Sequence, residues 1–153
     1  MNDSLQQQLE MLNRLCKECN HIYGRLAAKL GMTESAFWVL YAITHSEEPL
    51  TQNDLCSSFF FPVQTIHSAI NGLRSKGLLE LQVIHGTRNR KAILLTEAGR
   101  AFAADTISRA DKMEKNALLM FTEEDRALYL SLYQRHIAYL KGEAERLLDD
   151  ASE

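Results

Sequence analysis

The hydrophobic pattern of the chain changes from a helical to a strand-like period shortly after Gly77. Before this point apolar residues recur every three or four positions, as they do on amphipathic helices. Leu79, Leu81 and Val83 instead alternate with more polar neighbours, as on a half-buried strand. A basic turn at residues 85–91 follows, and residues 92–95 are apolar again. The sequence therefore predicts a mainly α-helical chain with one small β-hairpin.

The segment before Gly31 predicts one long helix. Ser4 followed by Gln7 is typical of a capping box at a helix start, and Gly31 ends the pattern. A single narrow apolar stripe leaves most of this helix polar, which indicates that it packs against a partner. The stripe consists of Leu5, Leu9, Leu12, Cys16, Cys19, Tyr23, Leu26 and Leu30.

Helix-capping residues divide the rest of the chain. Threonines followed by an acidic residue within the next three positions are typical of helix starts, and proline suits a first helical position. Phe59 to Phe61 interrupt the helical pattern, Gly77 ends the fourth helix, and a break falls between Phe121 and Thr122. The starts of the second to sixth helices are predicted at Thr33, Thr51, Pro62, Thr96 and Thr122.

The charge of the chain is unevenly distributed. The whole chain has 17 basic and 20 acidic residues, a net charge of −3. Residues 62–100 contain six basic residues and two acidic ones, so this segment carries +4 and the remainder −7. A basic centre between acidic flanks favours local contact with nucleic acid, although an ordinary solvated surface has the same charges.

The basic segment combines two elements that suit DNA. A polar helix after a short helix and a turn is the order of a helix-turn-helix, whose second helix enters the major groove. Side chains with donors and acceptors on its exposed face match base edges and phosphates. The candidate contacts are Val63, Gln64, Thr65, His67, Ser68 and Asn71 on the helix, with Arg88, Asn89, Arg90 and Lys91 on the hairpin tip.

Three segments resemble the MarR family of winged helix-turn-helix transcription regulators. They are residues 30–40 (LGMTESAFWVL), residues 62–73 (PVQTIHSAINGL) with 76–78 (KGL), and residues 88–92 (RNRKA) with 95–100 (LTEAGR). The resemblance implies a winged helix-turn-helix fold in which helices from both ends of the chain interlock into a homodimer. It implies one intertwined domain: residues 1–31 a dimerisation helix, 32–100 the DNA-binding lobe, and 101–153 further dimerisation helices.

The resemblance also implies the function. Such a dimer binds double-stranded DNA at a palindromic operator, represses a nearby operon, and is released by a small aromatic or lipophilic effector. The effector crevice is expected at His21, Tyr23, Trp38 and Tyr41, which as single residues also suit core packing. We expect a cytoplasmic, nucleoid-associated protein, since the chain has neither an apolar run long enough for a membrane span nor a signal-peptide pattern.

Two residues depart from the family pattern. The family has aspartate between the wing arginines, where this chain has Asn89, and an aspartate would hold a neighbouring arginine by a charge-assisted bond. His67 stands where small polar residues or asparagine are common, and it can donate to a phosphate or a base.

Other chemistry has weaker support in the sequence. Cys16 and Cys19 suit either a redox sensor or small apolar residues in a dimer core. The five histidines lack zinc-site spacing, so no metal and no cofactor are expected. No catalytic motif is present, and we expect no enzymatic activity. The alternatives that stay open are a winged-helix module that binds proteins and DNA only weakly, and a cysteine-based redox regulator.

Overall fold

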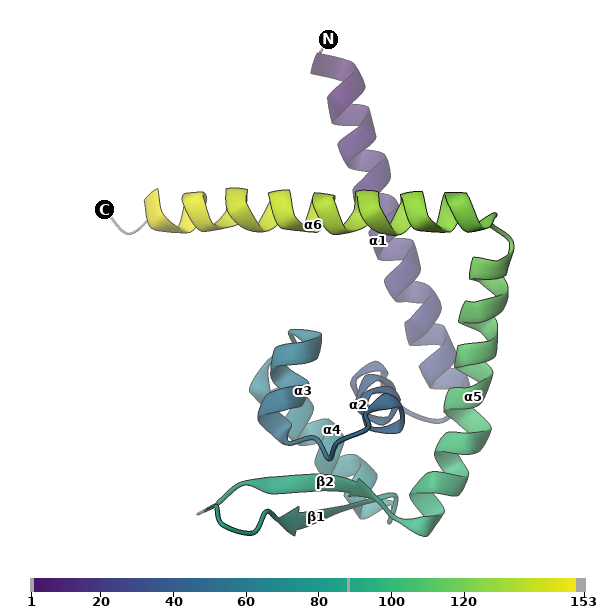
Figure 1. Ribbon diagram of the computed structural model, residues 1–153, viewed down its shortest axis with the longest axis vertical. Coiled ribbons are helices and arrows are strands. Elements are labelled where there is room, and N and C mark those ends of the chain that lie inside the picture. The colour runs from purple at the N-terminus through teal and green to yellow at the C-terminus, as the bar shows by residue number, and fades with distance from the viewer. Residues whose placement is uncertain (1, 88, 151–153) are drawn as a thin grey trace. The chain divides into compact units, whose positions relative to one another are not determined.

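The computed structural model describes residues 2–87 and 89–150, with the side chains of residues 4–87 and 89–149 (Figure 1). The chain forms two compact units, Met1–Ala110 and Asp111–Glu153, and each is described by itself. The predicted division into segments 1–31, 32–100 and 101–153 stays a prediction.

Helices make up most of the described chain, with a single hairpin between them, so the predicted fold class is confirmed. Strands β1 and β2 pair antiparallel, with Leu79 opposite Leu95 and Val83 opposite Lys91. The elements are α1 (Asn2–Lys29), α2 (Glu34–His45), α3 (Gln52–Phe59), α4 (Val63–Ser75), β1 (Leu79–Val83), β2 (Lys91–Leu95), α5 (Glu97–Leu119) and α6 (Glu123–Asp150).

Most helix starts lie where the capping residues predict them. The Thr33 hydroxyl accepts a hydrogen bond from the amide of Ala36 (3.2 Å). Thr51 and Asp54 form a complete capping box at the start of α3. Phe60 has the left-handed conformation (φ 54°) and its amide donates to the Cys56 carbonyl, which ends α3 at the predicted interruption.

Three local expectations are wrong. Helix α1 already includes Asn2, so Ser4 lies inside it, and its hydroxyl accepts from the Gln8 side chain (3.5 Å) instead of capping. Pro62 has ψ 143°, outside the helical region, and is therefore the N-cap of α4 and not its first helical residue. Lys91 belongs to β2 and not to the turn, because it continues the strand register opposite Val83.

The core of the first unit lies between α2, α3, α4, the hairpin and the first half of α5. Phe37, Leu40, Leu55, Ile66 and Ile107 are completely buried. Burial of each such side chain contributes about 1.5–3 kcal/mol to folding. This core holds α4 by its apolar face and leaves the opposite face of the helix exposed.

A backbone contact that the sequence pattern did not predict fixes the hairpin to the helices. The amide of Ile93 in β2 donates to the carbonyl of Leu50 (2.8 Å), just before α3 begins. The two residues form an isolated antiparallel bridge, so the segment before α3 extends the hairpin by one short contact. The hairpin position is therefore set by α3 as well as by its covalent link to α4.

The second unit consists of the end of α5 and all of α6. Thr122 caps α6 as predicted, accepting from the Asp125 amide (3.1 Å) and donating to the Asp125 carboxylate (2.9 Å). The Arg126 guanidinium donates to the Phe121 carbonyl (2.9 Å), which satisfies an acceptor at the helix break. Large apolar side chains remain exposed along this unit, including Met120, Leu128, Leu132, Leu140 and Leu147.

The start of α5 allows no side chain at position 99. Gly99 is buried, and a Cβ built there would overlap the carbonyl oxygen of Leu78. That carbonyl is held in place because it accepts the Thr96 amide (3.1 Å). We therefore expect Gly99→Ala to lower the free energy of unfolding by about 2–4 kcal/mol, measured by urea denaturation.

Gly72→Ala is the matched control, because a Cβ at this exposed helical position meets nothing within 4 Å. It should raise stability by roughly 0.5–1 kcal/mol through the lower entropy of the unfolded chain. Equal stability of Gly99→Ala and the wild type would show that the α4–α5 junction is looser than this packing implies.

Candidate nucleic-acid interface

Helix α4 separates its side chains into a buried and an exposed face. Ile66, Ala69, Ile70 and Leu73 are buried, at the spacing of one helix face. Of the predicted DNA-contacting residues on α4, only Thr65 is half-buried. The others are exposed: Val63, Gln64, His67, Ser68 and Asn71.

A groove runs along one side of this exposed face, between α4 and the start of α2. It has a volume of about 620 Å³. Thr33, the N-cap of α2, and Ser35 in its first turn contribute hydroxyls, and Gln64 and Ser68 contribute polar groups from α4. Lys76 supplies a cation at the end of α4. We name this cavity the α2–α4 groove.

A second groove lies on the other side of α4, between that helix, the start of α3 and the hairpin. It has a volume of about 420 Å³. We name it the α4–wing groove. Its polar lining consists of Thr51, Gln52, Asn53, His67, Asn71, Arg74, Asn89, Arg90 and Lys91. Three of these residues are cations, and no carboxylate is among the described residues that line either groove.

Four polar side chains form a hydrogen-bonded row beside the α4–wing groove. A His67 ring nitrogen, Nδ1, lies 3.4 Å from Gln52 Oε1, and the other, Nε2, lies 2.9 Å from Asn71 Nδ2. Arg74 Nη1 donates to Asn71 Oδ1 over 3.5 Å. The row joins α3 to the exposed face of α4.

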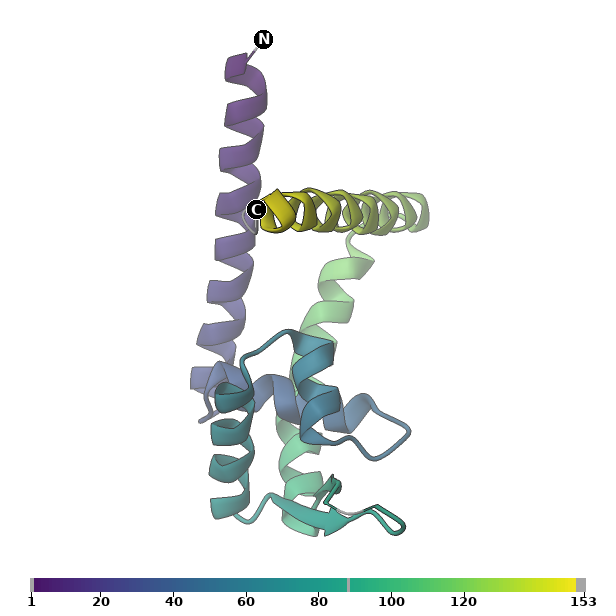
Figure 2. The same cartoon turned by 90° about the vertical axis from the view of Figure 1, so that its left-hand side faces the viewer.

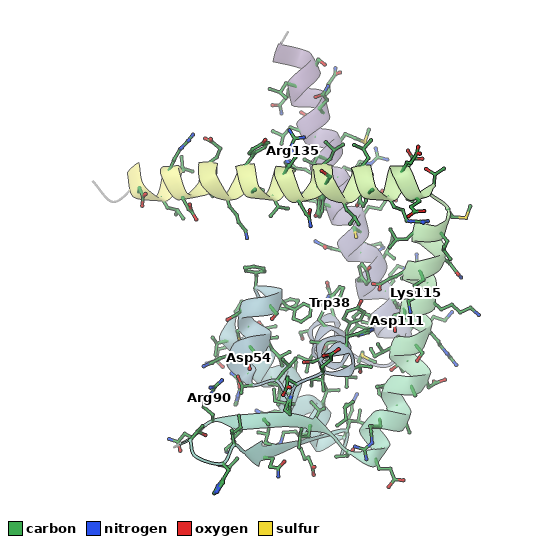
Figure 3. All side chains as sticks on the ribbon, viewed as in Figure 1. Trp38, Asp54, Arg90, Asp111, Lys115 and Arg135 are labelled. Atoms are coloured by element: carbon green, nitrogen blue, oxygen red, sulfur yellow. The ribbon has the colours of Figure 1, made fainter. Side chains whose placement is uncertain are left out.

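The hairpin tip is described except for Arg88, which lies outside the described residues. Asn89, Arg90 and Lys91 are all exposed. Figure 3 shows Arg90 extending toward α3 on the side that carries Asp54. Hydrogen bonds from Thr51 hold the pKa of the Asp54 carboxyl below its usual value, and the nearby Arg90 charge lowers that pKa further. Asp54 thus supplies a carboxylate beside the wing, where Asn89 has none.

The structure brings together three of the four predicted effector-crevice residues. Ring centroids of Tyr23 and Trp38 lie 4.8 Å apart, and those of Trp38 and Tyr41 lie 5.5 Å apart. Phe37 and Phe59 complete the aromatic cluster. These rings are packed against the core, whereas His21 is exposed on α1. Their role in effector binding stays a prediction.

The predicted redox residues are both exposed in the described chain. Cys16 and Cys19 lie on α1 as free thiols, three residues apart and therefore on one side of the helix. Cys56 is half-buried beside the core. Within the described residues, no group of three or more His, Cys, Asp or Glu side chains could hold a metal ion. None of the described helices is long and apolar enough to cross a membrane.

Sequence reasoning missed several groove residues. Thr33, Ser35, Gln52, Asn53 and Lys76 line the two grooves but were not among the candidate contacts. Thr33 was interpreted only as a cap, although a helix start with hydroxyls also presents backbone amides to an anion. For Gln52 and Asn53 the sequence offers no local signal, since only the tertiary fold brings them next to α4.

Figure 2 shows the helix-turn-helix followed by the two-stranded hairpin. This order, with polar grooves on both sides of the second helix, defines the class of winged helix-turn-helix proteins. The MarR family model matches residues 30–88. Residues 30–88 therefore belong to the MarR family, and the chain has the fold of MarR family regulators. The resemblance inferred from the sequence is confirmed.

Solved structures support the fold over most of the chain. NMB1585, a MarR family regulator from Neisseria meningitidis, is 23% identical, with a TM-score of 0.74 over 90% of this chain and 95% of that chain. The S. aureus MepR–DNA complex is 21% identical, with a TM-score of 0.70 over 86% and 96%. A MarR/EmrR family regulator from Acinetobacter sp. ADP1 is 14% identical, with a TM-score of 0.74 over 90% and 96%. Comparison with curated proteins gave no match.

The lowered pKa of Asp54 predicts how the start of α3 responds to acid. Because this pKa lies below the unfolded value of about 3.8, the carboxylate stabilises the fold above that pH. Its contribution is lost as the pH falls through the folded-state pKa. Asp54→Ala should therefore cost about 1 kcal/mol at neutral pH, and the deficit should shrink toward about pH 3.

The measurement is urea denaturation of both proteins across a pH series. Asn53→Ala is the control, since Asn53 is adjacent, exposed and uncharged. Its difference from the wild type should not change with pH. A deficit of Asp54→Ala that stays constant down to about pH 3 would contradict the role of the ionised carboxylate.

Proposed function

We propose that this protein is a DNA-binding transcription regulator whose α4 lies in the major groove. The observation that carries the proposal is the ridge of exposed polar side chains on α4 between two grooves whose described lining residues include no carboxylate. A helix in the major groove has a phosphate strand on either side. The grooves supply hydroxyls and a lysine on one side of α4, and three cations on the other.

The exposed face of α4 and the wing have different tasks in this proposal. Gln64, Thr65 and Ser68 have donors and acceptors for base edges, which carry the sequence information. Arg90 and Lys91 contact phosphates or the minor groove, where the negative potential is concentrated. Arg88 is proposed for the same role on the basis of the sequence alone.

We propose further that the protein acts as a homodimeric repressor on a palindromic operator. The support is the exposed apolar surface of α1 and α6, which a single chain leaves uncovered, together with the resemblance to dimeric MarR regulators. In such a dimer the two α4 helices must lie roughly 34 Å apart to reach successive major grooves. A small ligand that changes this spacing would release the DNA. The aromatic cluster around Trp38 is the proposed ligand region.

Salt-dependent DNA binding tests the assignment of roles. Fluorescence anisotropy should be recorded on a duplex selected from a randomised library and on a scrambled duplex. Arg90→Ala and Lys91→Ala should each weaken binding to both duplexes and lower the log–log salt slope by roughly 1, because each variant neutralises one phosphate fewer. Gln64→Ala should weaken binding to the selected duplex by roughly 1–3 kcal/mol more than binding to the scrambled duplex.

Arg109→Ala is the matched control for charge. Arg109 is an exposed cation on α5 that pairs with Asp105 (3.0 Å) and lines neither groove. Its loss should leave the salt slope unchanged. Weak, salt-insensitive binding of the wild type to every duplex would instead favour a protein-binding winged-helix module.

The proposed dimer gives a separate prediction for α6. Leu128, Leu132 and Leu140 are each more than half exposed in the single chain. Burying a charge at such a position in an interface is unfavourable, so Leu132→Glu should convert dimer to monomer and weaken binding to a palindrome. Light scattering coupled to size-exclusion chromatography measures the mass.

Gln134→Glu is the control, because Gln134 is an exposed and already polar residue of the same helix, and the substitution adds the same charge. This variant should keep the mass and the affinity of the wild type. A dimer that survives Leu132→Glu unchanged would place the dimer contact elsewhere.

A further inference from the structure

The hydrogen-bonded row beside the α4–wing groove suits the recognition of one particular base. This inference rests on the proposed DNA binding and deepens it. Gln52 is the first residue of α3, while His67, Asn71 and Arg74 follow one another along α4. The three contacts measure 3.4, 2.9 and 3.5 Å. Gln52 is half-buried, whereas His67 and Asn71 are exposed at the face proposed to meet DNA.

Hydrogen-bonding chemistry gives this row a direction. A guanidinium is only a donor, so the Asn71 atom facing Arg74 is the amide oxygen. The Asn71 amide nitrogen therefore faces His67, and a nitrogen that donates needs an unprotonated Nε2 to accept. The ring proton is then on Nδ1, where it is donated to the Gln52 oxygen. Each side chain donates to the next, from Arg74 to Gln52.

This direction fixes which groups of Asn71 remain free. An amide oxygen has two acceptor sites and an amide nitrogen has two hydrogens. Arg74 and His67 each use one, which leaves one acceptor and one donor next to each other on an exposed amide. In the major groove adenine presents the matching pair, an N6 donor beside an N7 acceptor. Guanine presents two acceptors there, and its O6 would face the Asn71 oxygen.

We propose that Asn71 reads an adenine in the operator, and that Gln52 is the positioning residue that fixes its amide through His67. Without the Gln52 acceptor, the imidazole loses the bond that sets its proton on Nδ1. A ring with the proton on Nε2 would donate to Asn71 and favour the turned amide, against the 3.5 Å bond from Arg74, so both orientations of the amide would be populated. The turned amide exchanges the positions of its donor and acceptor, so their order no longer matches N6 and N7.

The charged groups around His67 do not provide an alternative way to hold the ring. The lining of the α4–wing groove contributes Arg74 from α4, Arg90 at the wing tip and Lys91 from β2, all of them donors only. From α3 it contributes the neutral side chains Gln52 and Asn53. Of the described side chains, Gln52 is thus the acceptor that the structure places against Nδ1.

The test is selection from a randomised duplex library, followed by affinity measurement on single-base variants of the selected site. The wild type should prefer adenine at one position of each half-site by roughly tenfold or more over the other bases. Asn71→Ala should abolish that preference and leave the other positions unchanged. Gln52→Ala should reduce the same preference to about two- to threefold, although Gln52 itself is proposed to touch no base.

Two further variants separate positioning from structural damage. Gln52→Glu keeps an acceptor oxygen for Nδ1 but adds a negative charge near the phosphates. It should therefore lower the affinity for every duplex and keep the adenine preference. Ser57→Ala removes an exposed polar side chain of the same helix, α3, that lines neither groove, and should keep both affinity and preference.

The outcomes distinguish this inference from the proposed function. A wild type that selects no sequence and binds without salt dependence overturns both. A wild type that selects a site, together with Gln52→Ala that keeps the full adenine preference, overturns the positioning role alone. The inference is supported if the adenine preference falls in Gln52→Ala, disappears in Asn71→Ala and is kept in Gln52→Glu and Ser57→Ala.

Discussion

The geometry of the candidate interface depends on the bonds made by Thr96. Its hydroxyl donates to the Gly77 carbonyl (2.6 Å) and accepts from the Gly99 amide (2.9 Å), while its amide donates to the Leu78 carbonyl (3.1 Å). One residue thereby joins the end of α4, the end of the hairpin and the start of α5. The left-handed conformation of Gly77 (φ 71°) turns the chain from α4 into β1 at the same point. This junction, together with the Leu50–Ile93 bridge, holds the cations of the hairpin beside α4.

Most of the local structure could be predicted from the sequence because local chemistry determines it. Thr33, Thr51, Thr96 and Thr122 each cap a helix through bonds to residues no more than three positions away. The change of hydrophobic period predicted the hairpin for the same reason. Ser4 failed as a cap because an N-cap residue must itself lie outside the helical conformation, and α1 already begins at Asn2.

The parts of the site that the sequence did not predict all depend on long-range contacts. The Leu50–Ile93 bridge and the Gln52–His67 contact join residues that are far apart in the chain. Asp54 illustrates the same limit, since it was interpreted only as a capping partner of Thr51. The fold also places it near Arg90. The wing therefore has a nearby carboxylate although position 89 is not an aspartate. This carboxylate belongs to Asp54 of α3.

The contact between Lys76 and Gly31 links the end of α1 to the end of α4. The Lys76 ammonium at the end of α4 donates to the Gly31 carbonyl just beyond α1 (3.1 Å), and Met32 and Thr33 line the α2–α4 groove beside it. A displacement of the end of α1 must either break this bond or move the end of α4 with it. Tyr23 of α1 contacts Trp38 of α2 through its ring. The aromatic cluster and the Lys76–Gly31 contact therefore both involve the last part of α1 and the residues that follow it. A ligand that separated Tyr23 from Trp38 would therefore act on a segment whose far end is bonded to the helix proposed to read DNA.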